Sequence, residues 1–324
     1  MVDLLTLGNL INTTLVFSTA LIFAALGGVF SERSGIVNIG IEGLMVFGAF
    51  AAAVGTHFAE EAGMGGASPW VGLLTGLIVG VLGSLIHAVA TITFKADQTI
   101  SGVVINFLAT GITLYLVKLL FDGAGETPLL LETFSKVNWE WFAGIPVIGP
   151  ILGVGIINSY PTTYVAIILV AVVYYVMYKT KFGLRLRSVG EHPSAADTMG
   201  INVKRMRYIG VMLSGALAGL GGATVTLTTT SLFSHTTISG QGFIAIAAMI
   251  FGKWNPLGVF GAAVFFGFSQ AIRNYVQLFA WSASIPQDFI LMLPYVLTIL
   301  VLVVAIGKSR APAALGEAYD PGKR

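Results

Sequence analysis

Long apolar runs divide the chain into segments of the length that a membrane-spanning helix needs. About 20 apolar residues cross the hydrocarbon core of a bilayer, and few charges interrupt these runs. The pattern therefore predicts an all-α, polytopic membrane helix bundle. The predicted spans lie at residues 10–30, 41–58, 69–94, 100–121, 162–178, 208–230, 257–280 and 287–307.

Two further apolar pieces do not fit a full span. Residues 239–252 are too few, and they end at a Lys-Trp-Asn-Pro sequence, which favours a half-helix or a re-entrant hairpin. Residues 142–157 contain two prolines and four glycines, so we expect them in an external loop. Counting these alternatives, the sequence predicts about 8–10 transmembrane helices.

Composition supports lipid as the solvent of this chain. Hydrophobic residues make up 56% of the 324 positions and charged residues only 10%, whereas soluble domains are about 25% charged. The 40 glycines suit close helix packing in a membrane. Two stripes at four-residue spacing are predicted to form such contacts: Gly72, Gly76 and Gly80, and Gly215, Gly219 and Ala223. Cysteine is absent, which excludes disulfides and cysteine-bound metal.

Basic residues predict the orientation, because cytoplasmic loops carry an excess of Lys and Arg. The segments 179–207 and 308–324 together hold 11 of the 17 basic residues, so both are predicted to be cytoplasmic. The loop 122–161 carries four acidic residues and one lysine, and it is predicted to lie outside, as is the N-terminus. We therefore expect a transmembrane domain over 1–307 in the cell membrane, followed by a loose cytoplasmic tail.

The cytoplasmic segment carries helix start and stop signals. Pro193 suits the first turn of a helix and Gly200 its end, which leaves room for about two turns. Ala195, Ala196 and Met199 give this piece a small apolar face. The residues alone leave two interpretations open. The piece transmits a push from a partner, or it is a solvated loop whose arginines anchor the orientation.

This stretch resembles the cytoplasmic coupling loop of ABC-importer permeases of the branched-chain amino acid, simple sugar and nucleoside group. The resemblance covers residues 183–205 and places a Gly-Glu-x-Pro-x-Ala-Ala-x-x-x-Gly-Ile pattern on this chain. It implies that the segment docks into a groove of the ATPase. His192 departs mildly, since Asn is common at that position. The implied ATPase-coupling residues are Gly190, Glu191, His192, Pro193, Ala195, Ala196 and Gly200.

Two other blocks resemble the same group. Residues 31–43 read Ser-Glu-Arg-Ser-Gly-Ile-Val-Asn-Ile-Gly-Ile-Glu-Gly, which is similar to the block after the first span of nucleoside-type members. Residues 240–262 are similar to the late hairpin of these permeases. The wording of the first block indicates uptake of a nucleoside, of the guanosine or purine type, rather than ribose or leucine.

The resemblance implies a permease subunit of an ATP-binding cassette importer, with no catalysis in this chain. Its implied partners are an ATPase that binds ATP and Mg²⁺, a second and paralogous permease, an external binding protein and membrane lipid. The sequence itself has no GxxxxGK[ST] loop. Simple sugars or branched-chain amino acids remain alternative substrates. An ion-coupled secondary transporter is the alternative mechanism, although a clear repeat and paired midplane carboxylates are missing.

Several polar residues in apolar surroundings are candidates for the substrate pathway. Glu42 is the main one, because an ionisable group at membrane depth is costly; the alternative is an interfacial cap of the second span, helped by Arg33. Glycines around it are expected to break the helix. An amide and an aromatic ring suit a nucleobase, which favours Gln241 and Phe243. The full candidate set is Asn38, Glu42, Asn106, Gln241 and Phe243.

Other chemistry finds little support. The four histidines are scattered, which predicts no metal site. No catalytic constellation or GxSG sequence indicates an enzyme. The basic segment is short and poor in aromatic residues, so no nucleic-acid partner is expected. Lys118 and Arg273 are interpreted as side chains that extend to the membrane interface.

Overall fold

The computed structural model describes residues 4–138, 149–276 and 310–321, together with six single residues between 285 and 299. The described part is a helix bundle with seven helices long and apolar enough to cross a membrane. The predicted span 287–307 lies outside the described ranges. The crossing helices are α1 (Leu4–Arg33), α2 (Ile41–Glu61), α3 (Ser68–Ala88) with the short helices η1 (Gly65–Ala67) and η2 (Val89–Thr93), α4 (Gln98–Leu120), α6 (Pro161–Lys179), α9 (Val203–Val225) with η4 (Thr226–Thr230), and α11 (Pro256–Val276).

Four shorter helices complete the described fold. They are η3 (Gly149–Ile157), α7 (Lys181–Glu191), α8 (Pro193–Thr198) and α10 (Gln241–Phe251). The expectation of an external loop over 142–157 is wrong for its second half, because η3 is helical and packs on the start of α1. Gly155 lies so close to Gly8 and Ile11 that a side chain there would contact them at 3.2 Å. The remaining residues of that piece lie outside the described ranges.

The two small-residue stripes form close helix contacts, as the sequence predicts, and the structure shows that they pack against each other. A Cβ on Gly80 would overlap the carbonyl oxygen of Gly215, and a Cβ on Gly219 would overlap that of Gly76. Backbone therefore meets backbone along α3 and α9. Such close approach is what small residues permit in membrane bundles.

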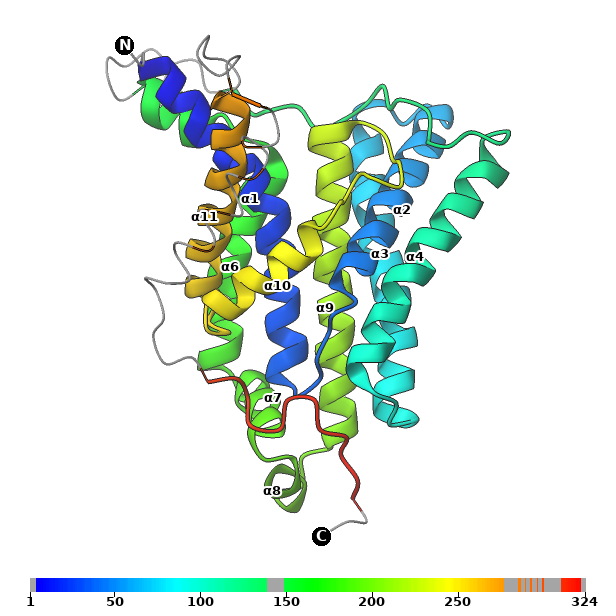
Figure 1. The fold of residues 1–324 in the computed structure, drawn as a ribbon, viewed down its shortest axis with the longest axis vertical. Coiled ribbons are helices and arrows are strands. Elements are labelled where there is room, and N and C mark those ends of the chain that lie inside the picture. Colours follow the sequence, from blue (N-terminus) through cyan, green and yellow to red (C-terminus); the bar gives the residue numbers. More distant parts are fainter. Residues whose placement is uncertain are drawn as a thin grey trace.

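The chain returns into the bundle after α1 without helical structure at first, as the glycines there predict; we call this an interrupted membrane crossing. Asn38 bonds to Ser214 of α9, and the carbonyl of Ser214 also faces Gly27 of α1. Asn38 is thus level with a point about 9 Å inside the end of α1, at 1.5 Å per helical residue. Residues 34–40 climb back into the bundle without helical structure, and α2 begins there (Figure 1).

A second interrupted crossing lies beside the first. The helix α10 has 11 residues, or about 16 Å, which is too short for a hydrocarbon core of about 30 Å. It runs obliquely past α1 to a turn that leads into α11 (Figure 1). A buried hydrogen bond holds this turn: Trp254 Nε1 donates to Glu32 Oε2 at 2.6 Å.

The two ends of the bundle differ in charge, because the Lys- and Arg-rich segment 179–207 lies at one end and the mainly acidic segment 122–138 at the other. We call the end that carries α7, α8 and residues 310–321 the basic end; Arg33 also lies there. The other, opposite end carries the first residues of α1 and the segment 122–138. There Lys136 donates to Asn12 Oδ1 at 2.5 Å, and burial lowers the pKa of this ammonium group.

Candidate functional site

Side chains from two helices, α3 and α4, hold the backbone of the interrupted segment 34–40. Gln98 accepts from the Val37 amide at 2.7 Å, and a His87 ring nitrogen lies 3.0 Å from the Val37 carbonyl. Asn106 donates to the carbonyl of Ile39 at 3.2 Å. Backbone groups in an apolar interior must find such partners. The extended segment is therefore a built feature of the bundle.

Glu42 joins the two interrupted crossings. Its Oε1 accepts from the amide of Gly240 and its Oε2 from the amide of Gly242, both at 2.6 Å. These amides belong to the first turn of α10, where helix N–H groups have no intrahelical partner. The predicted alternative, a cap of the second span helped by Arg33, is wrong. Arg33 instead lies at the basic end, 3.8 Å from Glu191.

Asn38 and Asn106 lie close to this junction rather than on an open surface. Asn38 is 1% exposed, and its Oδ1 has no hydrogen-bond partner within the described part of the chain. Asn106 is half-buried and accepts from the amide of Gly43 at 2.8 Å. The structure thus gives Asn106 a bracing contact with the start of α2, while its predicted place in the substrate pathway stays a prediction.

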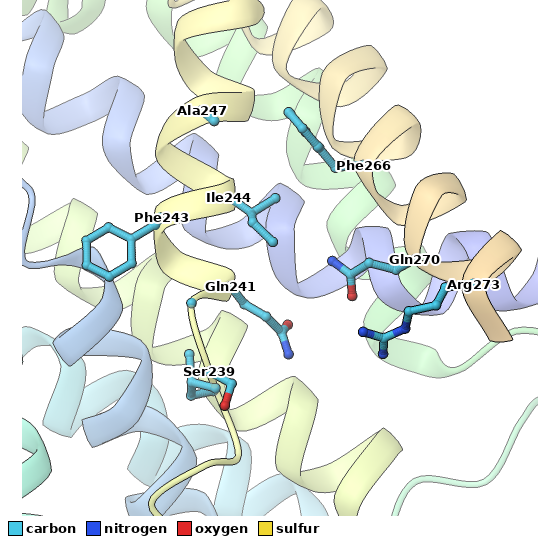
Figure 2. A pocket seen from close by; sticks show the side chains of 10 residues that line it. Ser239, Gln241, Phe243, Ile244, Ala247, Phe266, Gln270 and Arg273 are labelled. Carbon is cyan, nitrogen blue, oxygen red and sulfur yellow. The ribbon is translucent and has the colours of Figure 1, made fainter. Parts of the chain in front are cut away.

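A cavity of about 460 Å³ lies between α10 and α11. Gln241 and Phe243 line it from α10, and Gln270 and Arg273 line it from α11. Figure 2 shows Gln241, Gln270 and Arg273 pointing toward one another, while Phe243 points to the other side of α10. Of the predicted pathway residues, Gln241 therefore faces the polar side chains of α11. It lies between the two glycines whose amides bind Glu42.

At the basic end, α7 and α8 form an elbow that bends at His192. Thr180 caps α7 by accepting from the amide of Gly183. His192 interrupts the helix, and α8 runs from Pro193 to Thr198. Gly200 ends it in a left-handed conformation, with φ of +78°. The predicted start at Pro193 and end near Gly200 are confirmed, whereas the helix α7 was not predicted.

The predicted coupling residues divide into two groups. Gly190, Glu191 and Ala196 hold the elbow in place: a Cβ on Gly190 would overlap the Arg33 carbonyl, Glu191 pairs with Arg33, and Ala196 is 4% exposed. His192 and Ala195 are exposed. Ala196 thus does not share the exposed face of Ala195, whose neighbour one turn on, Met199, is 81% exposed.

Residues 310–321 form a strap across the basic end, drawn in red in Figure 1. The amide of Ala314 donates to the Gly190 carbonyl at 2.9 Å, and that of Gly316 to the Gly35 carbonyl at 3.1 Å. Arg207 donates to the carbonyl of Glu317 at 2.8 Å. The expected loose tail is wrong for these residues. The strap ties the elbow to the interrupted segment and to α9.

Sequence reasoning missed several residues of this arrangement. His87, Gln98 and Ser214 were not singled out as partners of the segment 34–40, and Arg273 was interpreted as an interfacial side chain. Isolated polar residues within apolar runs were the available signal. Their partners in the segment are 50 to 176 residues away in sequence, so no local pattern could pair them.

The chain is similar to known transport proteins of the membrane. The family model described as "Branched-chain amino acid transport system / permease component" matches residues 10–302. The guanosine ABC transporter permease protein NupQ of Bacillus subtilis is 51% identical, over 98% of both chains. The nucleoside ABC transporter permease protein NupC of Lactococcus lactis is 44% identical, also over 98% of both chains.

A more distant relative is the guanosine ABC transporter permease protein NupP of Bacillus subtilis. It is 28% identical, over 77% of this chain and 69% of its own length. The family match covers most of the chain, and the bundle has the composition and helix lengths of a multi-pass membrane protein. This chain belongs to the family of permease components of branched-chain amino acid transport systems.

Proposed function

We propose that the chain is the permease subunit of an ABC importer that carries a nucleoside. The observation that carries this proposal is the elbow: a short, capped helix that stands out from the bundle and is braced against it on its inner side. NupQ and NupC support the nucleoside as substrate, because both align over nearly the whole chain. Simple sugars and branched-chain amino acids are the alternative substrates within the same class.

The proposed partners follow from the two ends. An ATPase subunit binds the exposed face of α8 and supplies ATP and Mg²⁺ chemistry, so that this chain itself catalyses no reaction. The basic end then faces the cytoplasm, together with the C-terminal strap. An external binding protein delivers substrate to the opposite end. NupQ and NupP are different permease proteins of one organism, which supports a paralogous second permease.

The contacts suggest how force reaches the pathway. Movement of α8 is transmitted by α7 to Gly190, and from there to Arg33 and to the strap. The strap bonds to the carbonyl of Gly35, which lies in the turn at the start of the interrupted segment. That segment leads directly to Glu42 and hence to the first turn of α10, at the edge of the cavity. A displacement of α8 at the basic end is therefore expected to reach the contact between Glu42 and the first turn of α10.

Substitution on the exposed face of α8 tests this proposal. We expect Met199→Asp to abolish co-purification of the ATPase and ATP-driven nucleoside uptake in vesicles, because a charge replaces an apolar contact at the docking surface. Met64→Asp is the matched control, since Met64 is 47% exposed and lies before η1 at the opposite end. Both variants should elute as monodisperse protein in detergent.

Two outcomes contradict the proposal. Normal ATPase binding and uptake in the Met199→Asp complex would remove the elbow as the docking surface. Uptake that continues in vesicles without ATPase, and collapses with a proton uncoupler, would indicate the ion-coupled secondary transporter instead.

A further inference from the structure

The cavity between α10 and α11 gathers polar side chains that have no partner among the described residues. Among the residues that the structure describes, the side chains of Gln241, Gln270 and Arg273 make no hydrogen bond or ion pair. All three are half-buried and face one another (Figure 2). Unpaired polar groups in an apolar interior cost free energy, and such residues in membrane spans mark functional sites. Their arrangement indicates a ligand.

The walls and size of the cavity suit a small ring compound. Ile244 and Ala247 of α10 and Phe266 of α11 supply the apolar surface, and Figure 2 shows Ile244 and Phe266 directed into the space between the helices. Its volume of about 460 Å³ falls within the range of roughly 300–1,000 Å³ that is usual for small-molecule sites. An apolar wall with a few convergent polar groups is the general design of such sites.

The charges near the cavity favour a neutral ligand over an anion. The first turn of α10 would ordinarily attract a phosphate, but the Glu42 carboxylate already occupies the amides of Gly240 and Gly242. This negative charge lies beside the cavity and offsets the positive charge of Arg273. A cationic ligand is disfavoured as well, because the Glu42 carboxylate is held by the two amides and the described lining residues include Arg273 but no Asp or Glu.

The donor pattern distinguishes between nucleobases. Arginine offers only donors, in a fixed planar fork, and this fork matches the adjacent O6 and N7 acceptors of guanine. Adenine presents an amino donor where guanine has O6, so the fork meets a donor there. The amide groups of Gln241 and Gln270 each add an acceptor and donors for the remaining polar edge.

We propose that this cavity is a substrate site for the base of an uncharged oxopurine nucleoside, with Arg273 bound to the O6/N7 edge and Gln241 and Gln270 bound to the rest of the polar edge. The inference rests on the proposed function and adds to it the base class and the residues that select it. It also assigns Gln270 and Arg273 to the pathway.

Direct binding tests the site apart from transport. The permease pair with its ATPase is placed in lipid nanodiscs without binding protein, and tritiated guanosine is displaced by unlabelled guanosine, inosine, adenosine or guanosine monophosphate. We expect guanosine and inosine to displace the label at concentrations about tenfold below that of adenosine, which is the discrimination of one bidentate pair. The monophosphate should compete no better than guanosine.

Variants locate the effect. In Arg273→Gln the preference for guanosine over adenosine should fall to near unity, and Arg273→Lys should restore charge without restoring the preference. Lys118→Gln is the matched control, because Lys118 lies exposed in the last turn of α4, away from the cavity lining. It should bind as the unmodified complex does.

Each contrary result has a definite meaning. An unchanged preference in Arg273→Gln, or no guanosine binding in a complex that still imports nucleosides, overturns the site and leaves the proposed function standing. Monophosphate binding tenfold tighter than guanosine overturns it in favour of an anion site. A complex that imports a sugar or an amino acid and no nucleoside refutes the proposed function itself.

Discussion

At the scale of single residues, Glu42 shows how one carboxylate replaces missing helical structure. Two helices begin inside the bundle, and each leaves N–H groups without partners in its own first turn. Glu42 is in the first turn of α2, yet it binds the first turn of α10. A negative charge at a helix N-terminus is also favoured by the helix dipole. The side chain thus fixes the relative position of two interrupted crossings.

We therefore expect Glu42→Ala to destabilise the protein by about 1.5–3 kcal/mol for each lost bond, the range for hydrogen bonds to charged groups. The stability of Glu42→Gln should lie between that of the unmodified protein and that of Glu42→Ala, because an amide offers one acceptor oxygen. Thermal unfolding of the purified protein in detergent measures the effect. Glu61→Gln is the control, since that side chain is 61% exposed and, in the described part of the chain, pairs with the half-buried His57 at 3.5 Å. Equal melting temperatures for Glu42→Ala and Glu61→Gln would contradict this role.

At the scale of helices, the glycine contact between α3 and α9 limits what the sequence tolerates. A Cβ on Gly219 would lie 3.0 Å from the Gly80 Cα and would overlap the Gly76 carbonyl. These obstacles are backbone atoms, so no side chain can move aside to make room. Gly111, in α4, is the opposite case, because a Cβ there meets nothing within 4 Å.

Gly219→Ala is expected to destabilise the protein by about 1–3 kcal/mol through overpacking. Gly111→Ala should be neutral or slightly stabilising, because alanine favours a helix by up to about 1 kcal/mol over glycine. The melting temperature and the yield of monodisperse protein after detergent extraction compare the two. A similar result for both variants would show that the stripe is not a tight contact.

The sequence predicted helices well and their interruptions partly. Spans follow from the length of apolar runs, so α1 to α4, α6, α9 and α11 were all anticipated. The break around Gly35 and Gly40 and the short helix α10 were also predicted. By contrast, the partner of Glu42 was not, since its two bonds join residues 198 and 200 positions apart. The strap was missed because Ala314, Gly316 and Glu317 make their contacts through backbone groups, which leave no trace in the side-chain pattern.

At the scale of the whole molecule, the proposed orientation can be tested with single cysteines, because the chain has none of its own. Ser194→Cys on exposed α8 should react with a membrane-impermeant maleimide only in inside-out vesicles. Ala62→Cys, exposed at the end of α2, should react only in intact cells. The two sites serve as controls for each other. Labelling of Ser194→Cys from outside would invert the bundle and refute the assigned role of the elbow.

The backbone contact between α3 and α9 also has a consequence for how the molecule moves. Switching elements need two discrete packing arrangements, and a contact without intervening side chains offers only one. We therefore expect this helix pair to act as a stationary frame during a transport cycle. The moving parts are then expected outside this pair, chiefly α10, whose first turn bonds to Glu42 of α2 and whose turn into α11 bonds to Glu32 of α1. In each transport cycle we expect α3 and α9 to keep their relative position while α10 moves against them.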